Sequence, residues 1–367
     1  MHTIIVCDWI PPAFGAVGQY MEQRARARAQ SASGSGHTTL IGLGAEAATE
    51  VETGLTIRRL AAPPVDKQAT VLRRGLWALG TSLRLLEATH RAIRAKPKAA
   101  YEVVVTGSPP FLAYLFIVFN RLVWRQALIY RITDFYPETL FAAGHLTWLR
   151  PLAGLFHWLR RGATRVEALG EDQRRRLAEG GIPTERVVVV RDASPIRDWS
   201  RRAPVARPFT ADKVILLYSG NLGVAHDIDT ICQAYERHIL HGSNRVRLWL
   251  NGVGGRVESL RAFCAARGLP LHFSAPAALE DLPEVLRACD GHLVLLGMPF
   301  WGYVLPSKIY ACLELDQPVF YVGPTQSDVH LLSKDRAAGY LQANPGDVDR
   351  CAANLESFAD RVMAGRD

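Results

Sequence analysis

The sequence predicts an α/β protein made of two doubly wound parallel sheets, one after the other along the chain. Three observations support this fold class. The 367 residues are enough for two domains of ordinary size. Short apolar runs alternate with helix-length segments throughout. A stretch rich in proline and arginine, without periodicity, divides these runs into two groups. Continuous apolar strands separated by helices are typical of parallel sheets that are covered on both faces.

The apolar runs define the expected strands and domains. In the first half they are 3–7, 38–41, 103–106, 128–132 and 187–190, and in the second half 214–218, 246–250, 292–296 and 319–322. We expect an N-terminal Rossmann-like domain at 1–194, a linker at 195–208 and a C-terminal Rossmann-like domain at 209–367. Such sheets bind ligands beyond the carboxyl ends of their strands, so two that face each other would share one cleft.

Composition excludes several classes of protein. Hydrophobic residues make up 49% and charged residues 21%, which is unlike a disordered chain or a polytopic membrane protein. The six cysteines are scattered and lack metal-ligand spacing, so we expect buried thiols in a reducing compartment. The first residues lack the basic region and cleavage site of a signal peptide. We therefore expect a cytoplasmic protein.

The positive charge is concentrated in the first half. Residues 1–200 contain 26 Lys and Arg against 17 Asp and Glu, whereas residues 201–367 contain 17 against 18. A basic domain beside a neutral one indicates that one half meets an anionic partner. Nucleic acid, a phosphorylated substrate and a lipid headgroup surface all satisfy this pattern.

Two basic amphipathic helices narrow the choice of partner. One carries a leucine stripe at helical spacing among arginines: Leu72, Leu76, Leu79, Leu83 and Leu86. The other spans 146–161 and places tryptophans ahead of paired arginines. Both stripes can face the protein core, or they can lie at a membrane interface, where tryptophan and arginine are favoured. The most apolar stretch, 111–119, is too short to span a bilayer.

Glycine turns follow several strands. Gly15 and Gly18 lead from the first strand into a helix, and such a turn lets the backbone and the helix N-terminus approach an anion. A tight turn without a ligand explains the same residues. The segment 42–47 matches the dinucleotide fingerprint but follows the second strand and precedes no long helix. A nicotinamide or flavin enzyme therefore remains an alternative that lacks the expected context.

The second domain repeats this arrangement. Gly220 and Asn221 follow its first strand, and His226 comes just before a helix. Neither Asn221 nor His226 is needed to form the turn, so both are candidates for ligand binding. Later in the chain, Ser307 can cap a helix whose first turn holds Lys308. The helix dipole disfavours a cation there, which indicates a nearby anionic ligand, although a solvated surface lysine is also consistent with the sequence.

Taken in order, these segments resemble glycosyltransferase family 4, and particularly its bacterial polysaccharide branch. The matching pieces are 8–19, 108–112, 134–138, 218–223, 306–310 and 318–323, and they extend over nearly the whole chain. The resemblance implies a GT-B fold, with two Rossmann-like domains facing across a cleft. It also implies a retaining, metal-independent hexosyltransferase that needs no cofactor besides its nucleoside-diphosphate sugar co-substrate.

The resemblance also implies site residues. Asp134, which would contact the transferred sugar, and Lys308, beside the phosphates, would be the catalytic residues. The donor-binding set would be Gly15, Gly18, Gly220, Asn221, His226, Ser307 and Glu314. Gln19, Ser108 and Pro109 would lie on the acceptor side. Two glutamates common in the family are replaced here by Tyr303 and Ala311, and Glu314 is the candidate substitute for the second.

The resulting expectation is a cytoplasmic glycosyltransferase, peripheral at the inner membrane, that builds cell-surface polysaccharide. Its partners would be a nucleotide-sugar donor, a lipid-linked saccharide acceptor and the membrane surface, with no nucleic acid. The missing glutamates leave open a non-catalytic GT-B scaffold or partner subunit. A sugar-nucleotide epimerase or hydrolase is a further alternative.

Overall fold

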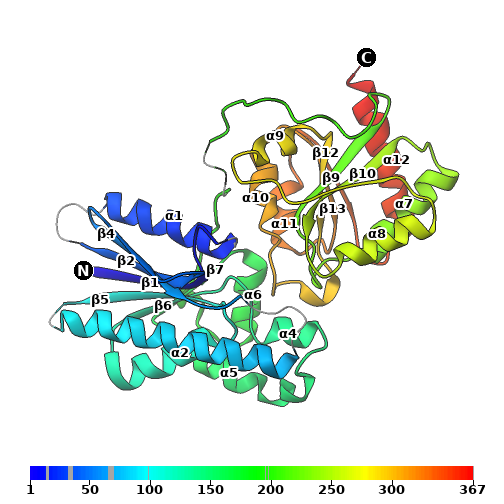
Figure 1. Cartoon of the computed structure of the whole chain (residues 1–367). Helices are drawn as coiled ribbons and strands as arrows, with labels where there is room; N and C mark the ends of the chain where they lie inside the picture. Colours follow the sequence, from blue (N-terminus) through cyan, green and yellow to red (C-terminus); the bar gives the residue numbers. More distant parts are fainter. Residues whose placement is uncertain are drawn as a thin grey trace. The chain divides into compact units, whose positions relative to one another are not determined.

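The computed structural model describes residues 1–13, 16–31, 36–64, 70–97, 99–194, 196 and 198–366. The chain divides into two compact units. Unit 1 comprises Met1–Asp192 together with Gly302–Val304, and unit 2 comprises Ala193–Trp301 and Leu305–Asp367. Figure 1 shows that each unit consists of a sheet with helices packed on it.

Unit 1 is built on an eight-stranded sheet with the strand order β3-β4-β2-β1-β5-β6-β7-β8. The strands are β1 His2–Trp9, β2 Thr38–Gly44, β3 Ala48–Glu52, β4 Leu55–Ala61, β5 Tyr101–Thr106, β6 Ala127–Arg131, β7 Arg165–Ala168 and β8 Val187–Val189. The α-helices are α1 Ala16–Ser31, α2 Val71–Ala95, α3 Leu112–Phe119, α4 Glu138–Ala142, α5 Ala153–Arg160 and α6 Glu171–Glu179. Shorter turns form the π-helix η1 Asn120–Trp124 and the 3-10 helices η2 Thr147–Leu152 and η3 Thr184–Arg186.

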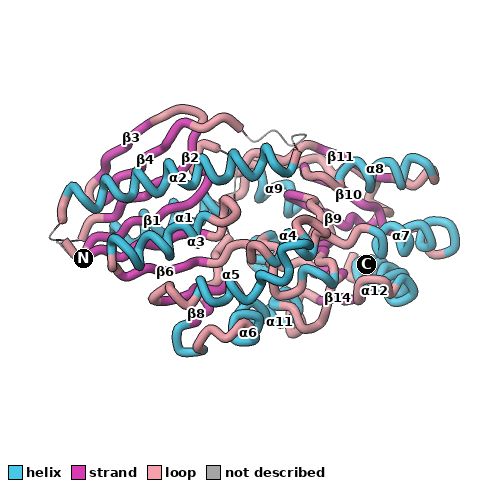
Figure 2. Tube along the Cα trace, turned by 90° about the horizontal axis from the view of Figure 1, so that it is seen from below, coloured by secondary structure: helices cyan, strands magenta, loops and turns pink. Residues whose placement is uncertain are grey.

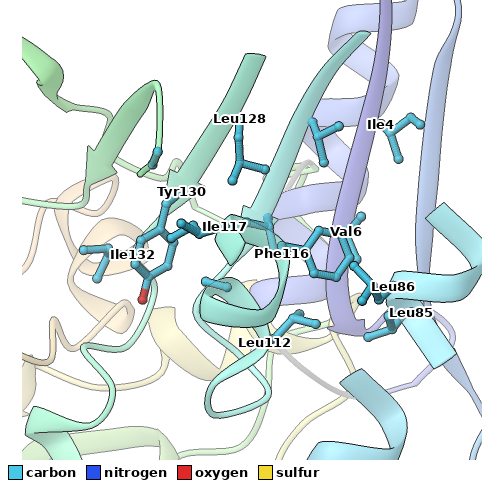
Figure 3. Close-up of a cluster of buried hydrophobic side chains, with 14 of the residues drawn as sticks. Ile4, Val6, Leu85, Leu86, Leu112, Phe116, Ile117, Leu128, Tyr130 and Ile132 are labelled. Carbon is cyan, nitrogen blue, oxygen red and sulfur yellow. The ribbon is translucent and has the colours of Figure 1, made fainter. Parts of the chain in front are cut away.

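The central strands of unit 1 are buried on both faces. On β1, Ile4 and Val6 belong to one apolar cluster, whereas Ile5 belongs to another on the opposite face. Helix α1 covers the Ile5 side, and helices α2 and α3 cover the Ile4 side. Figure 3 shows part of the second layer, including Leu85 of α2 and Phe116 of α3. This two-sided burial explains why these strands are continuously apolar.

One edge of this sheet is a charged hairpin, and β8 forms the other edge. Strand β3 pairs with β4 in antiparallel fashion, whereas the other ladders of unit 1 are parallel. All five residues of β3 are exposed. Glu50 forms an ion pair with Arg59, and Glu52 forms one with Arg26 of α1. The hairpin therefore ends the sheet with paired charges.

Unit 2 contains a six-stranded parallel sheet in the order β11-β10-β9-β12-β13-β14. Its strands are β9 Val214–Asn221, β10 Val246–Val253, β11 Leu271–Ser274, β12 Gly291–Leu295, β13 Val319–Val322 and β14 Tyr340–Ala343. Its helices are α7 Asp229–His241, α8 Val257–Ala266, α9 Leu282–Arg287, α10 Lys308–Leu313, α11 Asp328–Ser333 and α12 Val348–Ala364, with a 3-10 turn η4 at Met298–Phe300.

The segment expected as a linker, 195–208, lies within unit 2. Ile196 is buried in an apolar cluster with residues of α9. The Trp199 indole donates a hydrogen bond to Glu314 (2.5 Å), and Arg287 donates to the Trp199 carbonyl (2.5 Å). An isoleucine and a tryptophan thus attach this segment to the α9–α10 side of the sheet.

The α/β expectation is confirmed. All nine expected strands are present, and β3, β4, β7, β11 and β14 are additional. Gly42 and Gly44 lie inside β2, so the segment that matches a dinucleotide fingerprint is a strand followed by another strand. Within the described ranges, we find no helix that combines the length and the apolar character needed to cross a bilayer.

Candidate functional site

Two glycine turns meet at the carboxyl edge of the unit 2 sheet. Strands β9 and β10 stay paired to their last residues, with Gly252 opposite Gly220. A Cβ atom on Gly252 would lie 2.1 Å from the Gly220 carbonyl oxygen, which is too close for any side chain. Gly220 has φ +118°, in the region that favours glycine. The two strand ends therefore present backbone without side chains.

Lys308 lies over this edge. It is the first residue of α10, and its Nζ is 2.9 Å from the centroid of the Tyr218 ring on β9. The Nζ also lies 3.9 Å from the point where a Cβ on Gly220 would be. This Nζ is buried and has no hydrogen-bond partner among the described residues. Burial lowers the pKa of Lys308 well below its usual value.

The neighbours of Lys308 are neutral. The His226 ring packs edge-on against Tyr218, with 5.9 Å between ring centroids. Its Nδ1 accepts a hydrogen bond from the Gly223 N–H (2.9 Å), and burial, assisted by the charge of Lys308, lowers the pKa of His226 to about 3. No described carboxylate forms an ion pair with Lys308. A buried amine without a counter-charge fits an anionic ligand.

The remaining donor-side candidates are distributed unevenly. Ser307 precedes Lys308, and contrary to expectation its side chain makes no capping hydrogen bond to α10. Asn221 is exposed at the end of β9. Glu314 lies at the other end of α10, exposed, with its carboxylate held by Trp199. The structure therefore brings Gly220, His226 and Lys308 together and leaves Glu314 apart from them.

A second polar group lies at the carboxyl edge of the unit 1 sheet. Asp8 is near the end of β1, Ser108 follows β5 and Asp134 follows β6, and these three strands are neighbours. Ser108 Oγ donates a hydrogen bond to Asp8 Oδ2 (2.7 Å). Burial raises the pKa of Asp8 to about 6, and burial together with the charge of Asp8 raises that of Asp134 to about 6. Neither carboxylate forms an ion pair among the described residues.

The other candidates of unit 1 lie on or near α1 and β5. Gly15 is outside the described residues. Gly18 is in the first turn of α1, where a Cβ would lie 1.8 Å from the Trp9 carbonyl oxygen. Packing of α1 against β1 thus accounts for this glycine. Gln19 is half-buried on α1, and Pro109 is buried beside Ser108.

Residues of the site that sequence reasoning did not assign include Asp8, Tyr218 and the loop after β10. Asn251 lies in β10 just before this loop, where it is buried and bridges the two neighbouring strands. Ser219 Oγ donates to Asn251 Oδ1 (3.1 Å), and Asn251 Nδ2 donates to Ser274 Oγ (2.9 Å). The signal for this loop was a second glycine cluster, 252–255, directly after a strand.

The acidic pair beside α7 has structural partners. Asp227 accepts a hydrogen bond from the Thr230 hydroxyl, and Asp229 lies 3.3 Å from the Arg256 guanidinium. Across the part of the chain that the structure describes, no group of three or more His, Cys, Asp or Glu side chains could hold a metal ion.

Comparison with known proteins identifies the fold. No family model and no curated protein matches the sequence. Among solved structures, a sucrose-phosphate synthase from Thermosynechococcus elongatus is similar with a TM-score of 0.71 at 15% identity, covering 99% of this chain and 94% of that chain. HepE of Anabaena, solved with UDP and glucose, gives 0.64 at 13%, covering 99% and 94%. WaaG, a glycosyltransferase involved in lipopolysaccharide biosynthesis, gives 0.65 at 15%, covering 100% and 92%. The chain has the GT-B fold, as the sequence predicted.

Proposed function

We propose that this protein is a retaining glycosyltransferase that takes a sugar from a nucleoside-diphosphate donor. The observation that carries the proposal is the buried, unpaired Nζ of Lys308 above the bare turn at Gly220. The likeness to HepE, which was solved with UDP and glucose, supports a nucleotide sugar as the ligand. In this reading, unit 2 holds the donor and unit 1 the acceptor.

The donor diphosphate matches the chemistry of unit 2. A departing nucleoside diphosphate gathers a charge of about −2 to −3, which a lysine and fixed backbone N–H groups can stabilise without a metal ion. Gly220 leaves room beneath Lys308 for phosphate oxygens to approach the backbone, and Gly252 packs against its carbonyl oxygen. Lys308 would become charged once the phosphate supplies its missing partner. Ala311 is buried and apolar, so the donor ribose would be held by other groups.

The carboxylates of unit 1 would bind sugar hydroxyl groups. Asp134 and Asp8 lack cationic partners, and carboxylates accept hydrogen bonds from hydroxyls. In the front-face mechanism that we propose for this transfer, the acceptor hydroxyl attacks from the face that the diphosphate leaves, and a phosphate oxygen takes its proton. The proposal therefore assigns no general base to the protein.

The proposed acceptor is a lipid-linked saccharide at the cytoplasmic face of the inner membrane, in polysaccharide assembly. The likeness to WaaG, described as acting in lipopolysaccharide biosynthesis, supports this acceptor class. The apolar and basic helices of unit 1 support a peripheral association with the membrane.

A donor panel tests the proposal. Purified protein would be mixed with UDP-, GDP- and dTDP-sugars, with binding followed by calorimetry and turnover by release of nucleoside diphosphate in the presence of lipid-linked acceptors. We expect one donor class to bind and turn over, and Lys308→Ala to lower its affinity by about 10- to 100-fold, as for a lost charge-assisted hydrogen bond. Lys334→Ala, an exposed lysine of unit 2, is the matched control.

The outcomes separate the rival functions. Absence of both binding and turnover for every nucleotide contradicts the enzymatic proposal. A folded Lys308→Ala protein that still supports normal surface polysaccharide in cells favours a scaffold subunit, for which the replaced glutamates at Tyr303 and Ala311 are the motivation. Release of free sugar or of an epimerised donor without any acceptor identifies a hydrolase or an epimerase.

A further inference from the structure

One face of unit 1 gathers exposed apolar side chains. Of the 21 large apolar residues that are exposed in the described chain, 11 lie on three neighbouring parts of this face. They are Leu72, Leu76, Leu79 and Leu83 on α2, Val118, Leu122 and Val123 on α3 and η1, and Trp148, Leu152, Leu155 and Trp158 on η2 and α5. We call this surface the α2–η1–α5 face. The other ten are scattered over both units.

The three parts form a continuous surface. Helix α3 contacts both α2 and α5, and Figure 2 looks onto these helices. The Trp124 indole of η1 donates a hydrogen bond to His90 of α2 (3.0 Å). The Arg121 guanidinium of η1 lies over the Trp158 ring of α5, 5.7 Å from its centroid. Side chains from one helix thus reach the next across the whole face.

Four of the five leucines of the α2 stripe do not face the core, and Leu86 is the buried exception. Leu85 and Leu86 are buried under the sheet, whereas Leu72, Leu76 and Leu83 are 74%, 62% and 49% exposed. At about 100° per residue, the exposed leucines occupy one side of the helix, next to the buried side rather than on it. A 25-residue helix therefore presents a second apolar side that no described residue covers.

The charge of this face has a single sign. Residues 71–95, 112–125 and 147–161 contain ten arginines and one acidic residue, Glu87, which is paired with Arg91. Nine of these arginines are exposed, and Arg160 is the buried exception. Leucine and tryptophan side chains interspersed with arginine match the interface of a bilayer that contains anionic lipids.

We propose that the α2–η1–α5 face docks onto a bilayer containing anionic lipids, with its leucines and tryptophans in the interface and its arginines on lipid phosphates. The proposal rests on the proposed function for its purpose, which is to bring a lipid-linked acceptor to unit 1. A bilayer fits better than an acidic protein partner because the positive charge and the apolar residues are both spread over all three parts of the face.

The face is linked to the acceptor edge of unit 1. Trp77 of α2 stacks on Trp9, with 6.4 Å between ring centroids at an angle of 13°, and Trp9 directly follows Asp8. The charge of Arg74 opposes the rise that burial causes in the pKa of Tyr136, two residues after Asp134. The Trp77–Trp9 contact places the N-terminal half of α2 beside the end of β1 that carries Asp8. Docking of α2 would place lipid headgroups near Asp8 and Asp134.

Vesicle flotation of the full chain tests the proposal. The vesicles contain phosphatidylcholine alone or with about one third phosphatidylglycerol, in low or high salt, since the Debye length falls from about 10 Å at 0.1 M to about 3 Å at 1 M. We expect flotation with the anionic vesicles at low salt and its loss at high salt. Arg73→Ala with Arg84→Ala should weaken partitioning about 25-fold, because each arginine near the surface contributes about fivefold.

A leucine pair tests the apolar part. Leu76→Glu with Leu83→Glu should abolish flotation, while Leu240→Glu with Leu331→Glu, two exposed leucines of unit 2, should leave it unchanged. Arg350→Ala with Arg361→Ala on α12 is the control for the arginine pair. All of these side chains are exposed, and Leu331 is the least exposed of the leucines at 41%. Circular dichroism would check that each variant is folded.

Three results overturn the proposal: no flotation with anionic vesicles, equal loss in the test and control pairs, or a dimer in solution that Leu76→Glu with Leu83→Glu separates. The last result would make the face an interface between two copies. Flotation requires no nucleotide and no turnover, so failure of the donor panel with intact flotation disproves only the glycosyltransferase function. Donor binding without flotation disproves only the docking surface.

Discussion

Lys308 combines two properties that rarely occur together, a buried amine and the absence of any hydrogen-bond partner among the described residues. Burial opposes the charged form, so the lysine is held toward its neutral state when no ligand is present. An anion at Gly220 reverses this preference, because the charged amine then gains an opposite charge at short range. Ligand binding and protonation are therefore coupled at this residue.

We expect nucleoside-diphosphate binding to take up a proton at neutral to mildly alkaline pH. The titratable neighbours of Lys308 stay neutral there. Burial lowers the pKa of His226 to about 3, raises that of Cys312 to about 12 and raises that of Tyr218 well above its usual value. Calorimetry in buffers of different ionisation enthalpy measures the uptake. Lys308→Ala should remove it, and Lys334→Ala should not. Equal uptake in both variants would assign the proton to another group.

The aspartates of unit 1 predict a stability that depends on pH. Because the pKa of Asp8 and Asp134 is raised from 3.8 to about 6, the folded state binds more protons than the unfolded state between these values. Stability conferred by the protonated pair is therefore lost as the pH rises through about 6. Above this range both carboxylates are ionised, and the folded state carries the cost of burying their charge.

We expect Asp134→Asn to raise the melting temperature at pH 8 by a few °C, corresponding to about 1–3 kcal/mol, and to change it little at pH 4. Sugar transfer should fall in the same variant. Asp316→Asn, an exposed aspartate of unit 2, should alter neither property. A melting temperature that drops at pH 8 would show that the carboxylate is stabilising and would contradict this assignment.

At the scale of elements, the paired ends of β9 and β10 form the base of the proposed donor site. Their backbones touch at Gly220 and Gly252, and the Asn251 amide ties β9, β10 and β11 together. Substitution of Gly252 should therefore disturb this turn far more than substitution of Gly255.

Gly252→Ala and Gly255→Ala form a matched pair. A Cβ at 252 would collide with the Gly220 carbonyl oxygen, whereas a Cβ at 255 would have no atom within 4 Å. We expect Gly252→Ala to cost about 1–3 kcal/mol of stability, as for other overpacked sites, and to weaken donor binding. Gly255→Ala should be close to wild type. Urea unfolding and nucleotide titration measure the two effects, and equal behaviour of the pair would contradict this packing.

Strands buried on both faces were the elements most readily predicted from sequence. Their apolar runs are continuous, as in β5 and β13. The strands that were missed are short or carry charged and polar residues, such as β7 with Arg165 and Glu167 or β14 with Gln342. Such strands are specified by pairing with a neighbour, which a local pattern does not reveal.

The candidate site was predicted in the same uneven way. Glycine turns after strands pointed to Gly220, and a lysine at a helix start pointed to Lys308. Tyr218 was missed because its role depends on which side chain the α10 helix brings over its ring. Asp8 and Asp134 are 126 positions apart and meet only because β1, β5 and β6 are neighbours. The sequence of α2 was consistent both with leucines that face the core and with leucines that lie at a membrane interface. The exposed fractions of these leucines were needed to exclude the core.

At the scale of the whole molecule, the two units carry different chemistry. Unit 1 has the arginine-rich face with its exposed leucines. Unit 2 has the buried amine of Lys308 and the glycine turns at Gly220 and Gly252. The net charge of +8 therefore belongs mainly to the half proposed to meet a membrane. Both units bury their cysteines.

We expect all six thiols to react slowly in the native protein. Cys7, Cys232, Cys264, Cys289, Cys312 and Cys351 are free and buried. Burial also raises the pKa of these thiols, which disfavours the reactive thiolate. Titration with a disulfide reagent should detect few thiols in buffer and six in denaturant. Rapid reaction of several thiols in the native protein would contradict this burial.

The hairpin of β3 and β4 affects how copies of the protein interact when they are close together. A protein that gathers on a two-dimensional surface meets its own copies at high local density, and an open strand edge then invites intermolecular pairing. Here the outermost strand is only five residues long and both of its glutamates are occupied by arginines of the same chain. Neighbouring copies would have to break these ion pairs before their sheets could join through β3, so this edge protects the protein against fibril-like assembly on the proposed membrane surface.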